Sequence, residues 1–224
     1  FIIVLIFISF QGRYLMKQEY TKQKILKCAL RLFSEHGYES VRVEQIANAV
    51  GIKAPSLYNH FKSKQAIFDA ILKESAEHYD NFAVSLSLHM ENAKKDAPSF
   101  ENISAESLAA TVKKIFLYSL HDETVSQTRK MMTIEQFRSP ELAAAYTRRY
   151  VERLVSYHAQ IFRPLMESGE IAAENPDSLA LLYVAPVITL IGICDREPQM
   201  ESACLEMLDA HIKLFWSTFG GGRR

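Results

Sequence analysis

The residues best suited to chemistry in this 224-residue chain lie between Lys53 and Lys64 and carry hydroxyl, amide, imidazole and ammonium groups. Such groups hydrogen-bond to DNA base edges and phosphate oxygens, asparagine being suited to adenine and lysine to guanine or phosphate. Ile52, Leu57 and Phe61 are expected to face inward, which leaves as outward positions Lys53, Ala54, Ser56, Tyr58, Asn59, His60 and Lys62. An ordinary solvent-exposed helix face has a similar composition, so this set alone does not decide between the two interpretations.

Two of the lysines lie at the expected starts of helices. Lys53 directly precedes a predicted helix at 54–61, and Lys64 lies in the first turn of the next helix, which Ser63 is expected to cap. Cations there oppose the helix macrodipole by a few tenths to about 1 kcal/mol each. A docked phosphate would use both the free backbone amides and these charges, so we predict phosphate contacts at Lys53 and Lys64.

The elements that must position these groups form a predicted helix-turn-helix. Apolar residues at helical spacing predict a supporting helix at 20–36 and a short helix at 43–50, in which Ala47 allows close helix crossing. Gly51 then provides a tight turn before the helix at 54–61. Two short helices joined by such a turn are typical of a DNA-binding helix-turn-helix.

This segment resembles the amino-terminal domain of the TetR family of bacterial transcriptional regulators. The residues that carry the resemblance are Gly37-Tyr38, Ile46-Ala47, Ala49-Val50-Gly51-Ile52, Ser56-Leu57-Tyr58-Asn59-His60-Phe61, Ser63-Lys64 and Ile67-Phe68. The resemblance implies that residues 42–61 are the DNA-reading motif, with 54–61 as the recognition helix. It also implies that Tyr58 and His60 approach the DNA backbone and a neighbouring base, and that Lys64 holds a phosphate.

The resemblance further implies a homodimer on a palindromic double-stranded DNA operator and a small-molecule effector bound in the carboxy-terminal domain. Two departures from the family pattern stand out. Val41-Arg42 replaces the usual hydroxyl residues, so Ser40 is a candidate cap and Arg42 a candidate phosphate contact. Lys53 and Pro55 stand where serine and glycine are frequent, which prevents inference of the operator sequence.

Helical periodicity continues to the end of the chain, so the predicted fold class is all-α: a three-helix helix-turn-helix domain at 16–68 and a larger helical ligand-binding and dimerisation domain at 69–219. Residues 1–15 are interpreted as a mis-called leader before Met16, and 220–224 as a disordered tail. The further helices are expected near 63–90, 104–120, 122–137, 140–168, 177–194 and 199–219, with a loop at 92–103 and a bend at Pro164.

The segment from Ser178 to Cys194 contains seventeen residues and no charge. A helix that is apolar nearly all round is buried on both sides, so we expect it to pair with the last helix and dock on a second subunit. The predicted dimer-interface residues are Leu182, Pro186, Leu190, Met200, Cys204, Met207, His211 and Phe215.

Aromatic residues and methionines gather between these helices and the helix-turn-helix. Each of them is compatible with ordinary core packing, but as a set with a few polar groups they are candidates for an effector cavity. The predicted ligand-binding residues are Phe116, Tyr118, His121, Met132, Gln136, Phe137, Tyr146 and Tyr150.

Composition and motifs argue against several other classes of protein. The three cysteines lack metal-ligand or disulfide spacing and favour a cytoplasmic protein, and no catalytic residue, metal site or cofactor motif is found. Residues 1–70 carry ten basic and five acidic side chains, which points toward a polyanion. The sequence therefore predicts a ligand-responsive DNA-binding regulator, most simply a repressor, with no membrane partner. The alternatives are a small-molecule-binding or enzymatic helical protein without DNA binding, and a regulator anchored to a membrane by residues 1–10.

Overall fold

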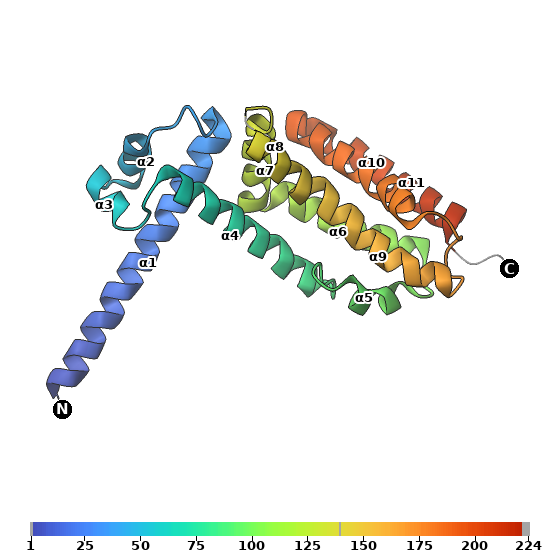
Figure 1. Cartoon of the computed structure of the whole chain (residues 1–224), viewed down its shortest axis with the longest axis horizontal. Helices are drawn as coiled ribbons and strands as arrows, with labels where there is room; N and C mark the ends of the chain where they lie inside the picture. Colours follow the sequence, from blue (N-terminus) through green and yellow to red (C-terminus); the bar gives the residue numbers. More distant parts are fainter. Residues whose placement is uncertain (1, 139, 221–224) are drawn as a thin grey trace. The chain divides into compact units, whose positions relative to one another are not determined.

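The structure is a computed structural model that describes residues 2–138 and 140–220, with side chains from Met16 onward except that of Lys17. Apart from an isolated bridge between Ile171 and Gly220, the described residues form helices and no strand, which confirms the predicted all-α class (Figure 1). The α-helices are α1 (Ile2–His36), α2 (Val43–Val50), α3 (Ala54–Tyr58), α4 (Lys64–Ser85), α5 (Ala93–Asp96), α6 (Ala105–His121), α7 (Glu123–Glu135), α8 (Pro140–Thr147), α9 (Arg153–Glu167), α10 (Pro176–Arg196) and α11 (Glu201–Phe219). Two 3₁₀ turns, η1 (Ala97–Phe100) and η3 (Pro198–Met200), and the π-helical η2 (Arg148–Glu152) complete the set.

The chain divides into two compact units. The first consists of the described residues up to Ala76 together with Gln127–Glu135, and the second of Glu77–Ser126 and the described residues from Gln136 onward. Both α4 and α7 therefore contribute residues to each unit. The last nine residues of α7 belong to the first unit. The domain predicted from sequence at 16–68 does not include them.

The core of the first unit is built by α1, α2 and the start of α4. Buried residues recur at helical spacing, as in Ile25, Ala29 and Phe33 on α1, and they meet Ile46 of α2 and Phe68 of α4 in the unit's core. Removing this apolar surface from water stabilises the unit by about 25 cal/mol per Å² of buried area. Together, α1, α2 and the start of α4 thereby support α3 at the surface.

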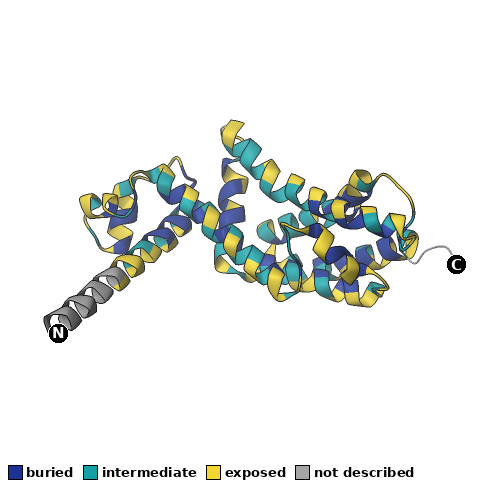
Figure 2. Cartoon of the chain, turned by 60° about the horizontal axis from the view of Figure 1, so that its bottom comes forward, coloured by how far each residue is buried: buried dark blue, intermediate teal, exposed yellow. Residues whose placement is uncertain are grey.

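The core of the second unit is formed mainly by α6, α9, α10 and α11. Phe116, Ile161, Ala180 and Ile212 are fully buried, one on each of these helices. Figure 2 shows the resulting pattern, in which buried and exposed residues alternate around each helix. α10 is the one described helix long and apolar enough to cross a membrane, but part of it lies in this core, as expected for a central helix of a folded domain.

Several elements differ from the sequence prediction, beginning with α1, which starts at Ile2 rather than near residue 20. The segment expected to be a loop at 92–103 contains α5 and η1, because Ala93, Ala97 and Phe100 pack into the core. The helix expected at 140–168 contains the wider π turn η2 at 148–152. Of the tail predicted at 220–224, Gly220 is described and forms a bridge with Ile171, which corrects the prediction there, and residues 221–224 lie outside the described residues, as do the side chains of the predicted leader.

Candidate nucleic-acid interface

The turn between α2 and α3 is built on Gly51, as predicted. Its backbone has a left-handed conformation with φ +82°, where a β-carbon is strained, and its N–H donates to the carbonyl oxygens of Ala47 and Asn48. The N–H of Ile52 donates to the carbonyl oxygen of Ala47 at 3.0 Å. These bonds satisfy the carboxyl end of α2 and turn the chain abruptly into α3.

α3 is shorter than predicted. It ends at Tyr58, and the N–H groups of His60 and Phe61 then both donate to the carbonyl oxygen of Leu57. Leu57 and Phe61 are buried, so the chain through Phe61 is anchored although the regular helix stops earlier. Of the three residues predicted to face inward, Leu57 and Phe61 are buried, whereas Ile52 is half-buried.

Most of the predicted DNA-contact residues lie on the accessible side of this motif. The exposed ones are Arg42, Lys53, Ser56, Tyr58 and Asn59, and the half-buried ones are Ala54, His60 and Lys64. Tyr58 is 49% exposed, which is high for a large aromatic residue. The face combines cations, an amide, hydroxyls and an imidazole, which can donate to phosphate and base-edge acceptors.

The start of α2 replaces the missing hydroxyl cap with a glutamine. The side-chain oxygen Oε1 of Gln45 accepts a hydrogen bond from the backbone N–H of Arg42 at 2.7 Å, and Arg42 is the N-cap residue. Ser40, the candidate cap from sequence, does not cap α2, because the N-cap position is Arg42, two residues later. The guanidinium of Arg42 is not needed to close the helix and remains exposed.

Lys64 has a structural role that the sequence did not reveal. Its Nζ donates to the carbonyl oxygens of Tyr38 at 2.9 Å and Val41 at 3.2 Å, and lies 4.1 Å from the centre of the Tyr38 ring. Ser63 caps α4 as predicted, its Oγ accepting from the N–H of Ala66. Lys64 therefore closes the loop between α1 and α2, and two of its three ammonium protons are already used.

Tyr38 is the centre of that loop. Its N–H donates to Oε1 of the fully buried Glu135 at 2.8 Å, and its hydroxyl donates to Oε1 of Gln65 at 3.0 Å. Its ring packs edge-on against Phe33 and Phe68. Burial, followed by nearby carboxylates, raises the pKa of the Tyr38 phenol. The loop that delivers Arg42 and α2 is thus held by contacts from α1, α4 and α7.

A comparison with known protein families finds a match over the same segment. The model of the family described as "Bacterial regulatory proteins, tetR family" matches residues 25–71, the segment that contains α2, the Gly51 turn and α3. This segment is therefore similar to the DNA-binding part of that family. Its resemblance to that family, predicted from the motifs, is therefore confirmed.

Individual transcriptional regulators are also similar to this chain. The chain is 42% identical over 60 residues to IcaR of Staphylococcus aureus strain Newman, a negative transcriptional regulator of the biofilm operon icaADBC; the match covers 27% of this chain and 32% of IcaR. It thus spans about a third of that relative. The chain is 26% identical over 156 residues to UidR of Escherichia coli K12, covering 69% and 70% of the two chains.

The solved complex of SmeT with triclosan has the same fold, with a TM-score of 0.69, 17% identity and coverage of 90% of this chain and 92% of the SmeT chain. SmeT is the repressor of the Stenotrophomonas maltophilia efflux pump SmeDEF.

The predicted ligand-binding residues divide between the two units. Phe116 is fully buried in the core of the second unit, whereas Met132 is buried in the first. Phe137 is 90% exposed, and His121 is exposed and pairs with Glu201 at 3.1 Å. These two side chains therefore line no interior space, a correction to the prediction. The remaining ones, Tyr118, Gln136, Tyr146 and Tyr150, are half-buried.

The predicted dimer residues divide between two faces of α10 and α11. Leu190, Cys204 and Phe215 are buried in the unit's own core, so they cannot meet a second subunit, which corrects that part of the prediction. Leu182 and Met207 are about half exposed, and Pro186, Met200 and His211 are half-buried. Leu181 and Leu214, which the prediction omitted, are also exposed. An apolar face thus remains on the outside of this helix pair.

Replacement of Lys64 by methionine should destabilise the protein even without DNA. Methionine keeps the apolar stem but leaves the carbonyl oxygens of Tyr38 and Val41 without their cationic donor, at a cost of about 2 kcal/mol. Urea denaturation measures the free energy of unfolding. The control is Lys62→Met, since Lys62 is exposed near α3. Equal stability of Lys64→Met and wild type would contradict the structural role.

Proposed function

We propose that this chain is a dimeric transcriptional repressor that binds a palindromic DNA operator and is released from it by a small effector. The observation that carries the proposal is the accessible face of α3 and its flanks, where Lys53, Tyr58 and Asn59 stand out from a rigid glycine turn. The regulatory roles of IcaR and SmeT support it. A protein that acts on DNA would work in the cytoplasm, and a non-enzymatic role follows from the same assignment.

The test is selection of DNA by the full-length chain from a random pool. A dimer that places two recognition helices in successive major grooves should enrich inverted repeats with half-sites about 34–36 Å apart along the duplex, or a multiple of that distance. Hydroxyl-radical footprinting should then show protection on one face of the duplex. Failure to enrich any sequence, by a chain that is folded by circular dichroism, would overturn the proposal.

Release of the protein from DNA requires an effector that binds its two conformations with different affinities. A compound that binds the second unit more tightly in a DNA-incompetent arrangement shifts the population away from DNA. Couplings of this kind amount to about 1–3 kcal/mol. The complex of SmeT with triclosan supports this part of the proposal, since it places an aromatic small molecule on a protein of the same fold.

Dimerisation is proposed through the exposed apolar face of α10 and α11. Substitution of Leu182 and Met207 by glutamate should convert the dimer into monomers, because four buried carboxylates would face one another across a two-fold interface. Sedimentation velocity measures the mass of the species. Val84→Glu, at an exposed apolar position of α4, is the matched control and should stay dimeric. A dimer that survives the double substitution would place the interface elsewhere.

A further inference from the structure

The carboxyl end of α2 directly precedes the turn that leads into α3. The last four carbonyl groups of any helix have no hydrogen-bond partner within that helix. In α2 the carbonyl oxygens of Ala47 and Asn48 are taken by the turn itself, since the N–H of Gly51 donates to both. The carbonyl oxygens of Ala49 and Val50 remain for donors from elsewhere. Whatever holds these two groups also fixes the point at which the turn begins.

Two side chains of α1 supply the donors. Nζ of Lys24 donates to the carbonyl oxygen of Val50 at 2.8 Å, and Sγ of Cys28 donates to that of Ala49 at 3.7 Å. Lys24 and Cys28 are four positions apart, so they lie on the same face of α1. A thiol is a weak donor, whereas the ammonium group forms a stronger, charge-assisted bond. Lys24 therefore makes the stronger of the two polar attachments between α1 and the end of α2.

The charge of Lys24 also suits this position. A cation near the carboxyl end of a helix is stabilised by the helix macrodipole. The sequence of α2 contains no basic residue, so the cation comes from the neighbouring helix. Lys24 is exposed, and an exposed lysine in a DNA-binding motif is usually assigned to phosphate. The bond to Val50 assigns this lysine to the protein's own backbone instead.

The orientation of α3 depends on the end of α2. α3 has five residues, too few for a helix to be stable by itself, and among the described helices its principal contact is with α2. Three residues, 51–53, separate the two helices. A displacement of the Val50 carbonyl group is therefore passed over a very short distance to Lys53 and Tyr58, which stand at the two ends of the reading face.

We propose that Lys24 is a positioning residue of the reading motif, which fixes the end of α2 and thereby the orientation of α3. It would serve recognition of bases and not binding of phosphate. Side chains that contact bases must be held within about 0.5 Å of their productive geometry, whereas phosphate contacts carry no sequence information. This inference rests on the proposed DNA binding, for which it names a residue that determines specificity without touching DNA.

The test compares two duplexes. Lys24→Met keeps the apolar stem and removes the donor, and fluorescence anisotropy gives the affinity of the full-length chain for the selected operator and for a duplex of scrambled sequence. We expect the operator to be bound about tenfold more weakly, from one lost charge-assisted hydrogen bond in each subunit, and the scrambled duplex to be bound as by wild type. Partial unfolding would weaken binding to both duplexes by the same factor, so the ratio of the two affinities reports positioning alone.

The salt dependence of operator binding distinguishes positioning from a phosphate contact. The slope of log affinity against log salt concentration should be the same for Lys24→Met and wild type. A direct phosphate contact in each subunit would instead make the slope of the variant smaller by about two. An unchanged ratio of affinities, equal weakening on both duplexes, or a smaller slope would overturn the proposal.

Two further variants show whether the hydrogen bond carries the effect. Lys24→Arg restores a cationic donor and should regain most of the tenfold ratio. Arg31→Met removes a cation from an exposed position of α1 two turns later, and as the matched control it should keep the wild-type ratio. An arginine variant that discriminates no better than Lys24→Met, or a control that loses as much as Lys24→Met, would contradict the assignment.

A measurement without DNA separates this role from the wider function. The N–H groups of Gly51 and Ile52 bond to carbonyl oxygens near the end of α2, and their hydrogen exchange can be followed by NMR. Both should exchange about tenfold faster in Lys24→Met, whereas the N–H of Gly37, at the end of α1, should not change. Faster exchange in a chain that selects no operator would retain the role of Lys24 at the turn and reject the repressor. Unchanged exchange in a chain that selects an operator would reject the role of Lys24 alone.

Discussion

Replacement of both Arg42 and Lys53 by glutamine is expected to weaken operator binding about 10³-fold. A dimer loses four cations at once, and each phosphate contact contributes about 1 kcal/mol, so the total of about 4 kcal/mol corresponds to three decades of affinity. Both side chains are exposed and neither closes a helix through its charged group. Protein stability should therefore stay within about 0.5 kcal/mol of wild type.

The salt dependence of DNA binding distinguishes the loss of direct phosphate contacts from a change in the overall charge of the protein. In a plot of log affinity against log salt concentration, the slope should fall by about four for the double variant, one for each lost phosphate contact. Fluorescence anisotropy of a labelled operator gives both quantities. Lys113→Gln with Lys114→Gln removes the same charge from exposed positions of the second unit and should leave the slope unchanged. An unchanged slope in the Arg42/Lys53 variant would mean that these residues do not touch the backbone.

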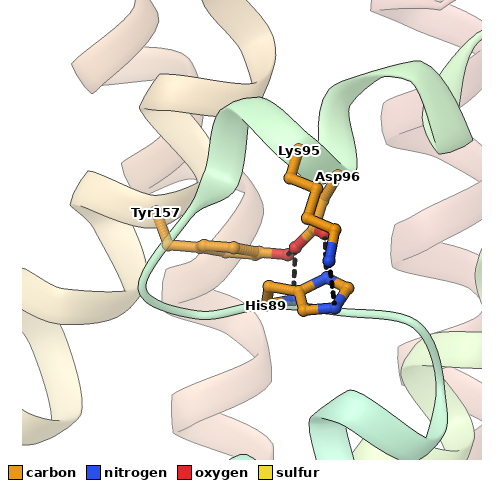
Figure 3. A network of polar contacts seen from close by, with 4 residues as sticks. All are labelled: His89, Lys95, Asp96 and Tyr157. Carbon is orange, nitrogen blue, oxygen red and sulfur yellow. Dashed lines mark hydrogen bonds and ion pairs between the residues drawn. The ribbon is translucent and has the colours of Figure 1, made fainter.

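Replacement of Asp96 by alanine is expected to destabilise the second unit by about 3–5 kcal/mol. Asp96 is 1% exposed and accepts hydrogen bonds from the hydroxyl of Tyr157 at 2.6 Å, from Nδ1 of His89 at 2.6 Å and from the N–H of His89 (Figure 3). Lys95 donates to the other nitrogen of His89 at 3.2 Å and so holds its tautomer. Alanine would leave several buried donors without an acceptor, one of the costliest changes in a protein interior. The free energy of unfolding from urea titration measures the loss.

The pH dependence of stability tests the charge of the same carboxylate. Burial alone raises the pKa of Asp96, but the hydrogen bonds from Tyr157 and His89 outweigh burial and lower it below its ordinary value. The contribution of Asp96 is therefore complete above about pH 4 and is lost as the pH falls further through the folded-state value. Asp96→Asn keeps the shape but should show no such loss. A wild type and an Asp96→Asn variant with parallel stability curves down to pH 3 would contradict a charged Asp96.

The helix-turn-helix could be predicted well from the sequence because the residues that define it lie close together along the chain. The spacing of Ile46, Ala47 and Val50, the glycine at 51 and the inward side chains of Leu57 and Phe61 are each set within a few residues, and the structure has them as expected. The exposure of Tyr58 follows directly from that register.

The remaining features depend on contacts between distant residues. α10 is apolar on nearly every side, so periodicity could not decide which of Leu182 and Leu190 faces outward; in the structure Leu190 is the buried one. The acceptors of Lys64 are carbonyl oxygens more than twenty positions earlier, and carbonyl groups leave no trace in side-chain patterns. Asp96 lies in a short polar stretch that is typical of loops, and only its contact with Tyr157, 61 positions later, explains its burial.

The buried carboxylate of Glu135 has a consequence for biosynthesis. Because Glu135 holds the N–H of Tyr38 and the last nine residues of α7 belong to the first unit, that unit is discontinuous along the chain. A ribosome that has released only the first eighty residues has exposed the reading helices but not the carboxylate that anchors their supporting loop. Nascent chains should therefore acquire operator affinity late in translation, after more than half of the polypeptide has emerged, and truncated products should compete poorly for DNA.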